Sequence, residues 1–210
     1  ALGYKKISEP AIYVKFKVKG TRDEYLVIYT STPWTLPSNM GIMVKPSADY
    51  VKVRTDNEVL IVAKILLKNL MEKFGYENYK ILETFKGKIL EGLEYEHPLH
   101  DLLPFLKNLK NIHRVILSEQ YVSLEEGTAL IHTAPGHGKE DYEVGVKNNL
   151  PVINPLNLNG TFKDDCGKYS GLYAKEADKI IIEDLKKRNA LIYQDEVNHE
   201  YPLCWRCTYP

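Results

Sequence analysis

Strict alternation of apolar and polar residues near the N-terminus constrains the fold most. Every second residue from Ile12 to Val18 is apolar, whereas Lys15 and Lys17 lie on the opposite face. A period of two residues predicts a half-buried strand. Residues 21–24 are polar and predict a turn, and residues 25–29 predict a second strand. The chain therefore begins as part of a sheet with one buried face.

Further strands and a few helices are predicted along the rest of the chain. The expected strands are residues 41–44, 50–54, 59–62, 79–85, 114–117, 128–133 and 191–194. Helical spacing of apolar residues predicts helices at 63–74, ending before Gly75, and at about 174–185, and a further helix is expected at 139–147. Gly and Pro punctuate residues 87–103, which we expect to be irregular. Because the helices do not alternate regularly with the strands, we predict an α+β fold with a barrel-like sheet rather than a doubly wound parallel sheet.

Composition narrows the class of protein. The chain has 210 residues, enough for one large domain or two small ones, and its 28 basic and 28 acidic residues cancel. A protein that grips nucleic acid by bulk charge would be basic, so any such contact here must be local or shared with a larger protein. No apolar run approaches the roughly 18 residues of a membrane span. Three cysteines, two of them in a C-x-x-C, predict a reducing, cytoplasmic compartment. The absence of an initiator Met and of a signal peptide predicts an excised cytoplasmic fragment.

The first segment that can carry chemistry is Thr30-Ser31-Thr32-Pro33-Trp34-Thr35-Leu36-Pro37-Ser38-Asn39. It follows a predicted strand, and its two prolines fix φ and remove two donors, so we expect a rigid loop and not a helix. Four hydroxyl side chains fall within six residues, at positions 30, 31, 32 and 35. Hydroxyls can orient a water or hold a ribose, but they also satisfy their own backbone in ordinary loops. Spacing alone favours the structural interpretation.

The second such segment runs from residue 128 to 142. A predicted strand carries His132 to its end, a Pro-Gly-His-Gly bend follows, and Asp141 lies near the start of the next helix, where negative charge is favoured. Both side chains can therefore face one pocket, although the residues alone favour the structural explanation, a satisfied strand-end histidine and a first-turn helix carboxylate. His132 and His137 are separated by Pro135 and Gly136, so no helix presents both as in HExxH, and we expect no catalytic metal.

The third segment contains Cys204 and Cys207. A C-x-x-C is half of a four-ligand zinc site, and the chain lacks the other half. Cys166 is distant in sequence, and His199 has an unspecific spacing. We therefore expect no metal in this chain, with Cys204 and Cys207 as zinc ligands only in a longer protein. No phosphate-binding glycine motif and no G-x-S-x-G elbow occur, so we expect no bound ATP.

Taken together, these segments resemble the isoleucyl-tRNA synthetase family. Thr-x-Thr-Pro-Trp-Thr-Leu-Pro-x-Asn at 30–39 is similar to its threonine-rich editing segment, whereas the valyl and leucyl relatives carry T-R-P-[ED]-T there. Residues 126–142, from Glu-Gly-Thr through His-Thr-Ala-Pro-Gly-His-Gly to Glu-Asp-Tyr, resemble the second editing motif. Residues 1–5 and 201–207 resemble the strands that leave and re-enter the synthetase core. The resemblance covers nearly the whole chain.

The resemblance implies a β-barrel-centred editing (CP1) domain at residues 1–200, with residues 201–210 as a return segment toward a Rossmann-type core. The HIGH and KMSKS signatures of that core are absent, so the chain should not activate amino acids. The implied function is hydrolysis of mischarged Val-tRNA(Ile). Valine lacks one methylene of isoleucine, which is worth only about 1–3 kcal/mol in a pocket, a value known from this enzyme family. A second, smaller site must therefore clear the error. The implied partners are the acylated end of tRNA(Ile) and the rest of the synthetase, with the protein a monomer.

The resemblance also implies residue roles. Asp141 should pair with the α-ammonium of the substrate, and His132 with Thr32 should form the wall that excludes isoleucine. Thr30, Ser31 and Asn39 should hold the terminal adenosine or the attacking water. Further substrate contacts are expected from Trp34, Gly136 and His137.

The resemblance implies neither a covalent nucleophile nor a cofactor, because an oriented water can attack an activated ester. Ser31 departs from the Thr that is common in the family, which keeps the hydroxyl and removes a methyl group. Two alternatives stay open. The chain could be a tRNA-binding module that has lost catalysis, or a zinc-ribbon interaction module.

Overall fold

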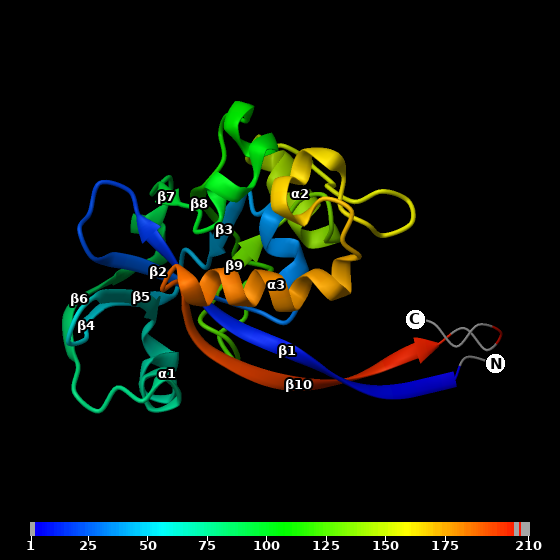
Figure 1. Ribbon diagram of the computed structural model, residues 1–210. Helices are drawn as coiled ribbons and strands as arrows, with labels where there is room; N and C mark the ends of the chain where they lie inside the picture. The colour runs from blue at the N-terminus through cyan, green and yellow to red at the C-terminus, as the bar shows by residue number, and fades with distance from the viewer. Residues whose placement is uncertain (1–2, 204–205, 207–210) are drawn as a thin grey trace.

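A mixed β-sheet forms the centre of the molecule, with helices around it (Figure 1). The structure is a computed structural model that describes residues 3–203 and 206. The strands of this part of the chain are β1 (Gly3–Val18), β2 (Glu24–Thr30), β3 (Gly41–Val44), β4 (Asp49–Arg54), β5 (Val59–Ala63), β6 (Lys80–Lys86), β7 (Tyr95–Glu96), β8 (Arg114–Leu117), β9 (Leu130–Thr133) and β10 (Leu191–Leu203). Its α-helices are α1 (Leu67–Phe74), α2 (Lys139–Lys147) and α3 (Ala174–Lys187).

Short 3₁₀ helices connect several of these elements. They are Pro33–Ser38, Lys64–Leu66, Gly87–Leu90, His100–Leu102, Pro104–Asn108 and Asp164–Tyr169. Three of them and the two-residue strand β7 fall at or near residues 87–103, where the sequence predicts irregular backbone. Frequent Gly and Pro there prevent longer regular elements.

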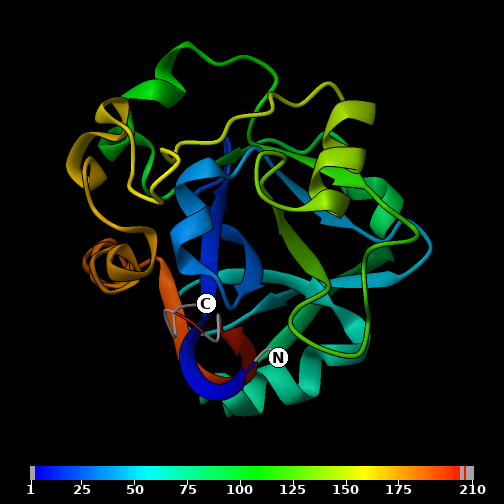
Figure 2. The same ribbon diagram turned by 90° about the vertical axis from the view of Figure 1, so that its right-hand side faces the viewer.

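The order of the strands confirms the predicted α+β class. The main path through the sheet is β6-β4-β5-β2-β9-β3-β8, and β1 pairs with β2, β7 and β10 off this path. β2 runs parallel to β5 and β9, and β3 runs parallel to β8, whereas the remaining pairs are antiparallel. The helices lie at separate places around this curved sheet, with α2, α3 and α1 in different sectors of Figure 2. No helix of the described residues is long and apolar enough to cross a membrane.

β1 and β10 form a long antiparallel ribbon that projects from the body (Figure 1). Their register runs from Val14 opposite Leu191 to Gly3 opposite Leu203. The sequence predicts only residues 191–194 as strand, because charged residues interrupt any alternation beyond them. Pairing with β1 extends β10 beyond the predicted residues, as far as Leu203. β10 continues across the predicted boundary at residue 200, while the division into domains stays a prediction.

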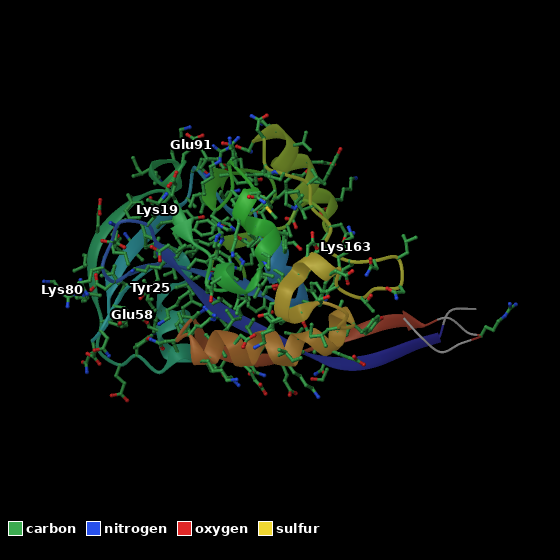
Figure 3. The ribbon with its side chains drawn as sticks, turned by 45° about the horizontal axis from the view of Figure 1, so that its top comes forward. Lys19, Tyr25, Glu58, Lys80, Glu91 and Lys163 are labelled. Carbon is green, nitrogen blue, oxygen red and sulfur yellow. The ribbon has the colours of Figure 1, made fainter. Side chains whose placement is uncertain are left out.

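The polar face of β1 is less exposed than the alternation suggests. Lys15 is 5% exposed and forms an ion pair of 2.6 Å with Glu58. Its ammonium group also lies 5.0 Å from the ring centre of Tyr25, and Figure 3 shows Tyr25 and Glu58 on the same side of the molecule. A paired and desolvated lysine explains how β1 buries both faces at this point.

The helices follow the sequence prediction closely. α2 has the predicted bounds, and α3 buries Ala177, Ile181 and Leu185 completely. α1 ends at Gly75, whose φ of 77° is the left-handed conformation that glycine adopts without strain. Residues 64–66, predicted as its first turn, form a 3₁₀ helix instead.

The prediction that residues 30–39 contain no helix was wrong. Pro33–Ser38 is a 3₁₀ helix, closed by hydrogen bonds from Thr35 N–H to Thr32 C=O and from Asn39 N–H to Leu36 C=O. Both prolines fit because neither supplies a donor that these bonds need. Pro33 stands in the first turn, where its fixed φ is already helical. The prolines thus shape a short helix that the sequence argument treated as a loop.

Candidate active site

The two chemically suggestive segments meet at one edge of the sheet. β2 and β9 are parallel neighbours, with Tyr29 opposite Ile131, so both strands end at the same edge. Residues 30–39 follow β2 and residues 134–141 follow β9. Between them lies a cavity of about 390 Å³, lined by Tyr29, Thr30, Ser31, Thr32, Trp34, Thr35, Ile131, His132, Ala134, His137, Gly138 and Asp141. A cavity of this size can hold an amino-acid ester and part of its nucleoside.

Hydrogen bonds link the hydroxyls of Thr30, Thr32 and Thr35 at the start of the 3₁₀ helix Pro33–Ser38. Thr30 Oγ1 accepts the Thr32 N–H at 3.1 Å, and Thr35 Oγ1 donates to the Thr32 carbonyl at 2.8 Å. Thr32 Oγ1 lies 3.3 Å from the hydroxyls of both other threonines. Ser31 differs, because its hydroxyl makes no hydrogen bond within the described part of the chain. The segment thus combines fixed hydroxyls with one that is free to meet a ligand.

His132 is held rigidly in the cavity wall. The residue is 8% exposed; its Nε2 lies 3.0 Å from Thr35 Oγ1, and its Nδ1 lies 2.8 Å from the side-chain amide nitrogen of Asn39. Burial, with smaller contributions from His97 and His137, lowers the pKa of His132 to about 3. The imidazole is therefore neutral throughout the physiological range.

Asp141 lies half-buried in the first turn of α2 and faces the same cavity. Burial raises its pKa to about 6; a backbone hydrogen bond from Ala134 opposes the shift and the neighbouring Glu140 adds to it. No cation contributes to this pKa, and no ion pair of Asp141 is found among residues 3–203 and 206. Burial of an unpaired carboxylate is unfavourable. Such a group suits a ligand that brings its own positive charge.

Trp34 and His137 form a second part of the cavity wall. Their rings are 5.1 Å apart and nearly perpendicular, and His137 Nε2 lies 2.9 Å from Ser38 Oγ. The Trp34 backbone N–H donates to Asp178 Oδ1 of α3 at 2.7 Å. α3 therefore fixes the start of the 3₁₀ helix from outside the cavity, a role that the sequence did not indicate.

Two residues expected to contact substrate do not line the cavity. Gly136 packs against the backbone of Ile153, where an added Cβ would come within 2.0 Å of the carbonyl oxygen. The absence of a side chain there lets two backbone segments approach closely. Asn39 is completely buried, and its amide bonds to protein groups on all sides. Its geometry is that of a support for His132 rather than a direct ligand contact.

The remaining candidate ligands do not assemble a metal centre in the described part of the chain. Within it, no three histidine, cysteine, aspartate or glutamate side chains are grouped so as to hold a metal ion. Cys166 is buried with its thiol 3.6 Å from the Pro155 carbonyl, and burial raises its pKa to about 12. Cys204 and Cys207 lie outside the described residues, so their expected role stays a prediction.

Comparisons with known proteins show which sequences this chain resembles. The chain is 46% identical over 207 residues to the isoleucine–tRNA ligase of Sulfolobus acidocaldarius and 48% identical over 215 residues to that of Pyrococcus furiosus. Each match covers 99% of this chain and 20% of the relative. The chain is homologous to a segment of the isoleucine–tRNA ligases. It spans about a fifth of the length of these relatives. No protein-family model matches it.

Solved structures show the same fold. The editing domain of the P. falciparum cytosolic leucyl-tRNA synthetase matches with a TM-score of 0.65 at 10% identity, over 89% of this chain and 99% of that one. The P. knowlesi editing domain matches with a TM-score of 0.61 at 14% identity, over 89% and 96%. The chain therefore has the fold of a synthetase editing domain, as the sequence predicts.

Proposed function

We propose that this isoleucine–tRNA ligase segment hydrolyses the ester of mischarged Val-tRNA(Ile). One observation carries the proposal: Asp141 is a half-buried carboxylate without an ion pair, in a cavity that the hydroxyl side chains of residues 30, 31, 32 and 35 also line. An aminoacyl ester presents an α-ammonium group, a carbonyl and ribose hydroxyls. The cavity offers a complementary group for each of them.

Asp141 binds the α-ammonium group. A charge-assisted hydrogen bond to a cation is among the strongest that a carboxylate makes. The cation offsets the burial that raises the Asp141 pKa, so binding shifts the carboxyl group to its ionised form. This contact positions the ester carbonyl beside residues 30–35.

A water molecule attacks the ester carbonyl, the bond from the carbonyl carbon to the ribose oxygen breaks, and the proton of the water passes to that oxygen. The free hydroxyl of Ser31 and the Thr30 hydroxyl, which keeps a proton to share with Thr32 or a ligand, orient this water or the terminal ribose. Orientation of an activated ester and a water supplies much of the required acceleration without a covalent nucleophile. We propose that no resident metal or other cofactor takes part.

His132 and Thr32 form the wall that excludes isoleucine. The His132 ring cannot turn aside, because both of its nitrogens are bonded to neighbouring side chains. Close-packed walls of this kind reject an added methylene by steric overlap. Replacing His132 with Ala should open the wall and expose Ile-tRNA(Ile) to hydrolysis. If Ile-tRNA(Ile) stays intact with that variant, His132 is not the sieve.

The rest of the synthetase is proposed to act in cis by delivering the acylated tRNA end, since the chain spans a fifth of its relatives. The basic and acidic residues of this chain cancel, which fits a domain that does not hold tRNA by bulk charge alone. We further propose a monomer in a reducing, cytoplasmic compartment.

A deacylation assay tests the proposal. Val-tRNA(Ile) and Ile-tRNA(Ile) are each incubated with the 210-residue chain at high concentration, and release of the amino acid is measured. Hydrolysis of the valyl ester alone is expected, and Asp141→Ala should abolish it. Glu140→Gln is the matched control, because Glu140 is an exposed acid one residue away and should leave the rate nearly unchanged. An Asp141→Ala rate equal to that of the unsubstituted chain contradicts the assignment.

Two other outcomes would identify the alternatives. Binding of tRNA without any hydrolysis would indicate a module that has lost catalysis. Stoichiometric zinc in the purified chain, again without hydrolysis, would indicate a zinc-ribbon interaction module.

A further inference from the structure

A chain of buried hydrogen bonds runs from Tyr95 on β7 to the cavity. Tyr95 donates its hydroxyl proton to Asn39 Oδ1 at 2.6 Å. Asn39 Nδ2 donates to the Gly41 carbonyl at 2.9 Å and lies 2.8 Å from His132 Nδ1. Tyr95 is 3% exposed and Asn39 is fully buried, so water does not compete for these bonds.

The direction of each bond follows from the chemistry of the groups. A backbone carbonyl only accepts, so the Asn39 atom that faces Gly41 must be its NH₂ group. The same NH₂ group faces His132 Nδ1 and gives its second hydrogen to it. A flipped amide would set its oxygen against the Gly41 carbonyl oxygen, which is unfavourable. His132 Nδ1 is therefore an acceptor and carries no proton.

The other side of the ring agrees with this assignment. A neutral imidazole has one proton, which must then lie on Nε2. Thr35 Oγ1 is 3.0 Å from Nε2 and gives its own proton to the Thr32 carbonyl. The Thr35 oxygen is thus available to accept from Nε2–H. Along the path Tyr95–Asn39–His132–Thr35–Thr32 each donor meets an acceptor, and the donor of each bond is fixed.

Tyr95 acts from outside the cavity. It lines a separate cavity of about 540 Å³ together with His97 and His113, on the far side of Asn39. Its ring packs at right angles on Phe16 with centroids 5.3 Å apart, which fixes the direction of its hydroxyl. Tyr95 therefore cannot touch a ligand bound beside Asp141, and any effect it has on hydrolysis must pass through Asn39.

We propose that Tyr95 is a positioning residue that, through Asn39, fixes His132 as the Nε2–H tautomer. In this form Nε2 has no lone pair, so His132 cannot remove a proton from the attacking water. It serves as a rigid wall and a hydrogen-bond donor to Thr35, and the proton of the water passes to the departing ribose oxygen without His132. The proposal deepens the editing function proposed above and rests on it for its catalytic consequence.

Nuclear magnetic resonance of ¹⁵N-histidine-labelled chain reads the tautomer directly, with His132→Ala used to assign the signal. We expect His132 to show the Nε2–H form. Tyr95→Phe removes the hydroxyl and keeps the ring. It leaves Asn39 Oδ1 buried without a donor, so the Gly41 carbonyl alone orients the amide; the amide can then turn, and we expect a mixture of tautomers. Asn39→Asp replaces the donor by an acceptor and should convert His132 to the Nδ1–H form. An Nδ1–H ring in the unsubstituted chain, or an unaltered tautomer in Tyr95→Phe, would overturn the proposal.

Tyr50→Phe is the matched control. Tyr50 is another buried tyrosine, and its hydroxyl donates to the Ala129 carbonyl at 2.7 Å, away from His132. It should lower thermal stability like Tyr95→Phe while leaving the tautomer unchanged. For Val-tRNA(Ile) we expect kcat to fall roughly tenfold to a hundredfold in Tyr95→Phe with little change in KM, and no such fall in Tyr50→Phe. Equal losses of kcat in both variants would mean a merely structural role for Tyr95.

The two proposals fail separately. The tautomer is measured on the free chain and does not depend on any hydrolysis. An inactive chain with an Nε2–H ring would remove the editing function and leave the tautomer assignment standing. An active chain with an Nδ1–H ring would do the reverse.

Discussion

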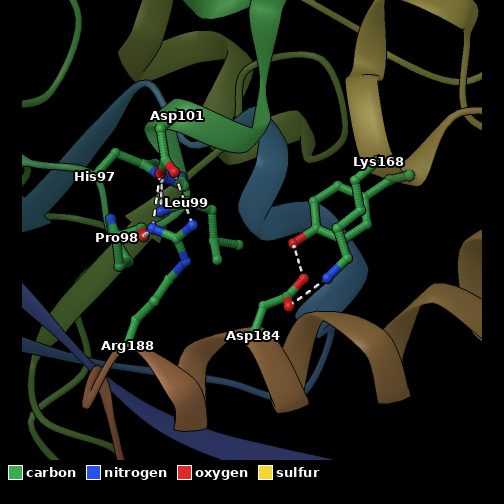
Figure 4. A network of polar contacts seen from close by, with 8 residues as sticks. His97, Pro98, Leu99, Asp101, Lys168, Asp184 and Arg188 are labelled. Atoms are coloured by element: carbon green, nitrogen blue, oxygen red, sulfur yellow. Dashed lines mark hydrogen bonds and ion pairs between the residues drawn. The ribbon is translucent and has the colours of Figure 1, made fainter.

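Asp184 on α3 has a cationic partner, whereas Asp141 in the candidate active site has none within the described residues. Asp184 is 4% exposed and accepts hydrogen bonds from Lys168 and Tyr169 (Figure 4). In the same figure Arg188 holds Asp101 with bonds of 2.7 and 2.8 Å. Asp141 has no such cation and its pKa rises to about 6. The carboxylates paired with cations join elements of the fold, whereas the one without a cation faces a cavity.

The two cavities on either side of Asn39 differ in the same way, in whether their acids have ion-pair partners. The cavity next to Tyr95 is lined by His97, His100 and His113, more histidines than the candidate active site contains. Of its three acids, Glu94 and Asp101 are paired with Lys19 and Arg188, and Glu96 is exposed. Histidines alone therefore do not indicate the active site, whereas a half-buried acid without an ion pair, beside several hydroxyl side chains, does.

Asp141→Asn gives the largest expected effect on stability. The folded-state pKa of Asp141 is about 6, above its usual 3.8, so the ionised group destabilises the fold above pH 6 and the penalty disappears as pH falls toward 4. Asn removes the charge and should raise the free energy of unfolding by up to about 3 kcal/mol at pH 8. Urea unfolding at pH 8 and at pH 4 measures this. A loss of stability at pH 8 would show that Asp141 is satisfied after all.

Asp184→Ala should act in the opposite direction. It leaves the buried Tyr169 hydroxyl without its acceptor and removes the partner of Lys168. An unsatisfied buried hydroxyl costs about 1–3 kcal/mol. We expect unfolding at a correspondingly lower urea concentration, while deacylation at a temperature where the variant is folded stays unchanged. Equal stability would mean that the bonds of Asp184 drawn in Figure 4 contribute nothing to stability.

The pH dependence of deacylation follows from the same pKa. Only the ionised Asp141 binds an ammonium group, and its fraction falls below pH 6 as the carboxyl group takes up a proton. We expect kcat/KM for Val-tRNA(Ile) to fall about tenfold per pH unit below pH 6. His132 contributes no step between pH 5 and 8, because its pKa is about 3. A second loss of activity near pH 6.5 in that profile would point to a titrating histidine instead.

Removal of metal gives the smallest expected effect, which is none. The described residues hold no group of three metal-ligating side chains, and the proposed hydrolysis needs only an oriented water. The rate after dialysis against a chelator should equal the rate before it. A rate that falls and returns with added zinc would contradict the proposal that no cofactor takes part.

Local patterns allowed much of the fold to be predicted. Residues 41–44, 114–117 and 139–147 have the bounds that period and capping predict. The shared cavity of His132 and Asp141 also follows from a sharp bend only nine residues long. These features depend on neighbouring residues, so a single sequence contains the information.

The supports of the site could not be predicted. Tyr95 reaches Asn39 over a separation of 56 residues, and Asp178 reaches Trp34 over 144. Neither has a local signal, because strand pairing and the packing of α3 bring these residues together. Similarly, β10 owes its length to its partner β1. Long-range contacts of this kind exist only in the folded chain.

Asp141 is about half protonated near pH 6, so the binding of a cationic ligand is coupled to the release of a proton. When a cation enters the cavity, a carboxyl group that was protonated in part of the population must release its proton to the buffer. The heat of binding measured by calorimetry will then vary with the ionisation enthalpy of the buffer near pH 6. A neutral ligand of the same shape would show no such dependence.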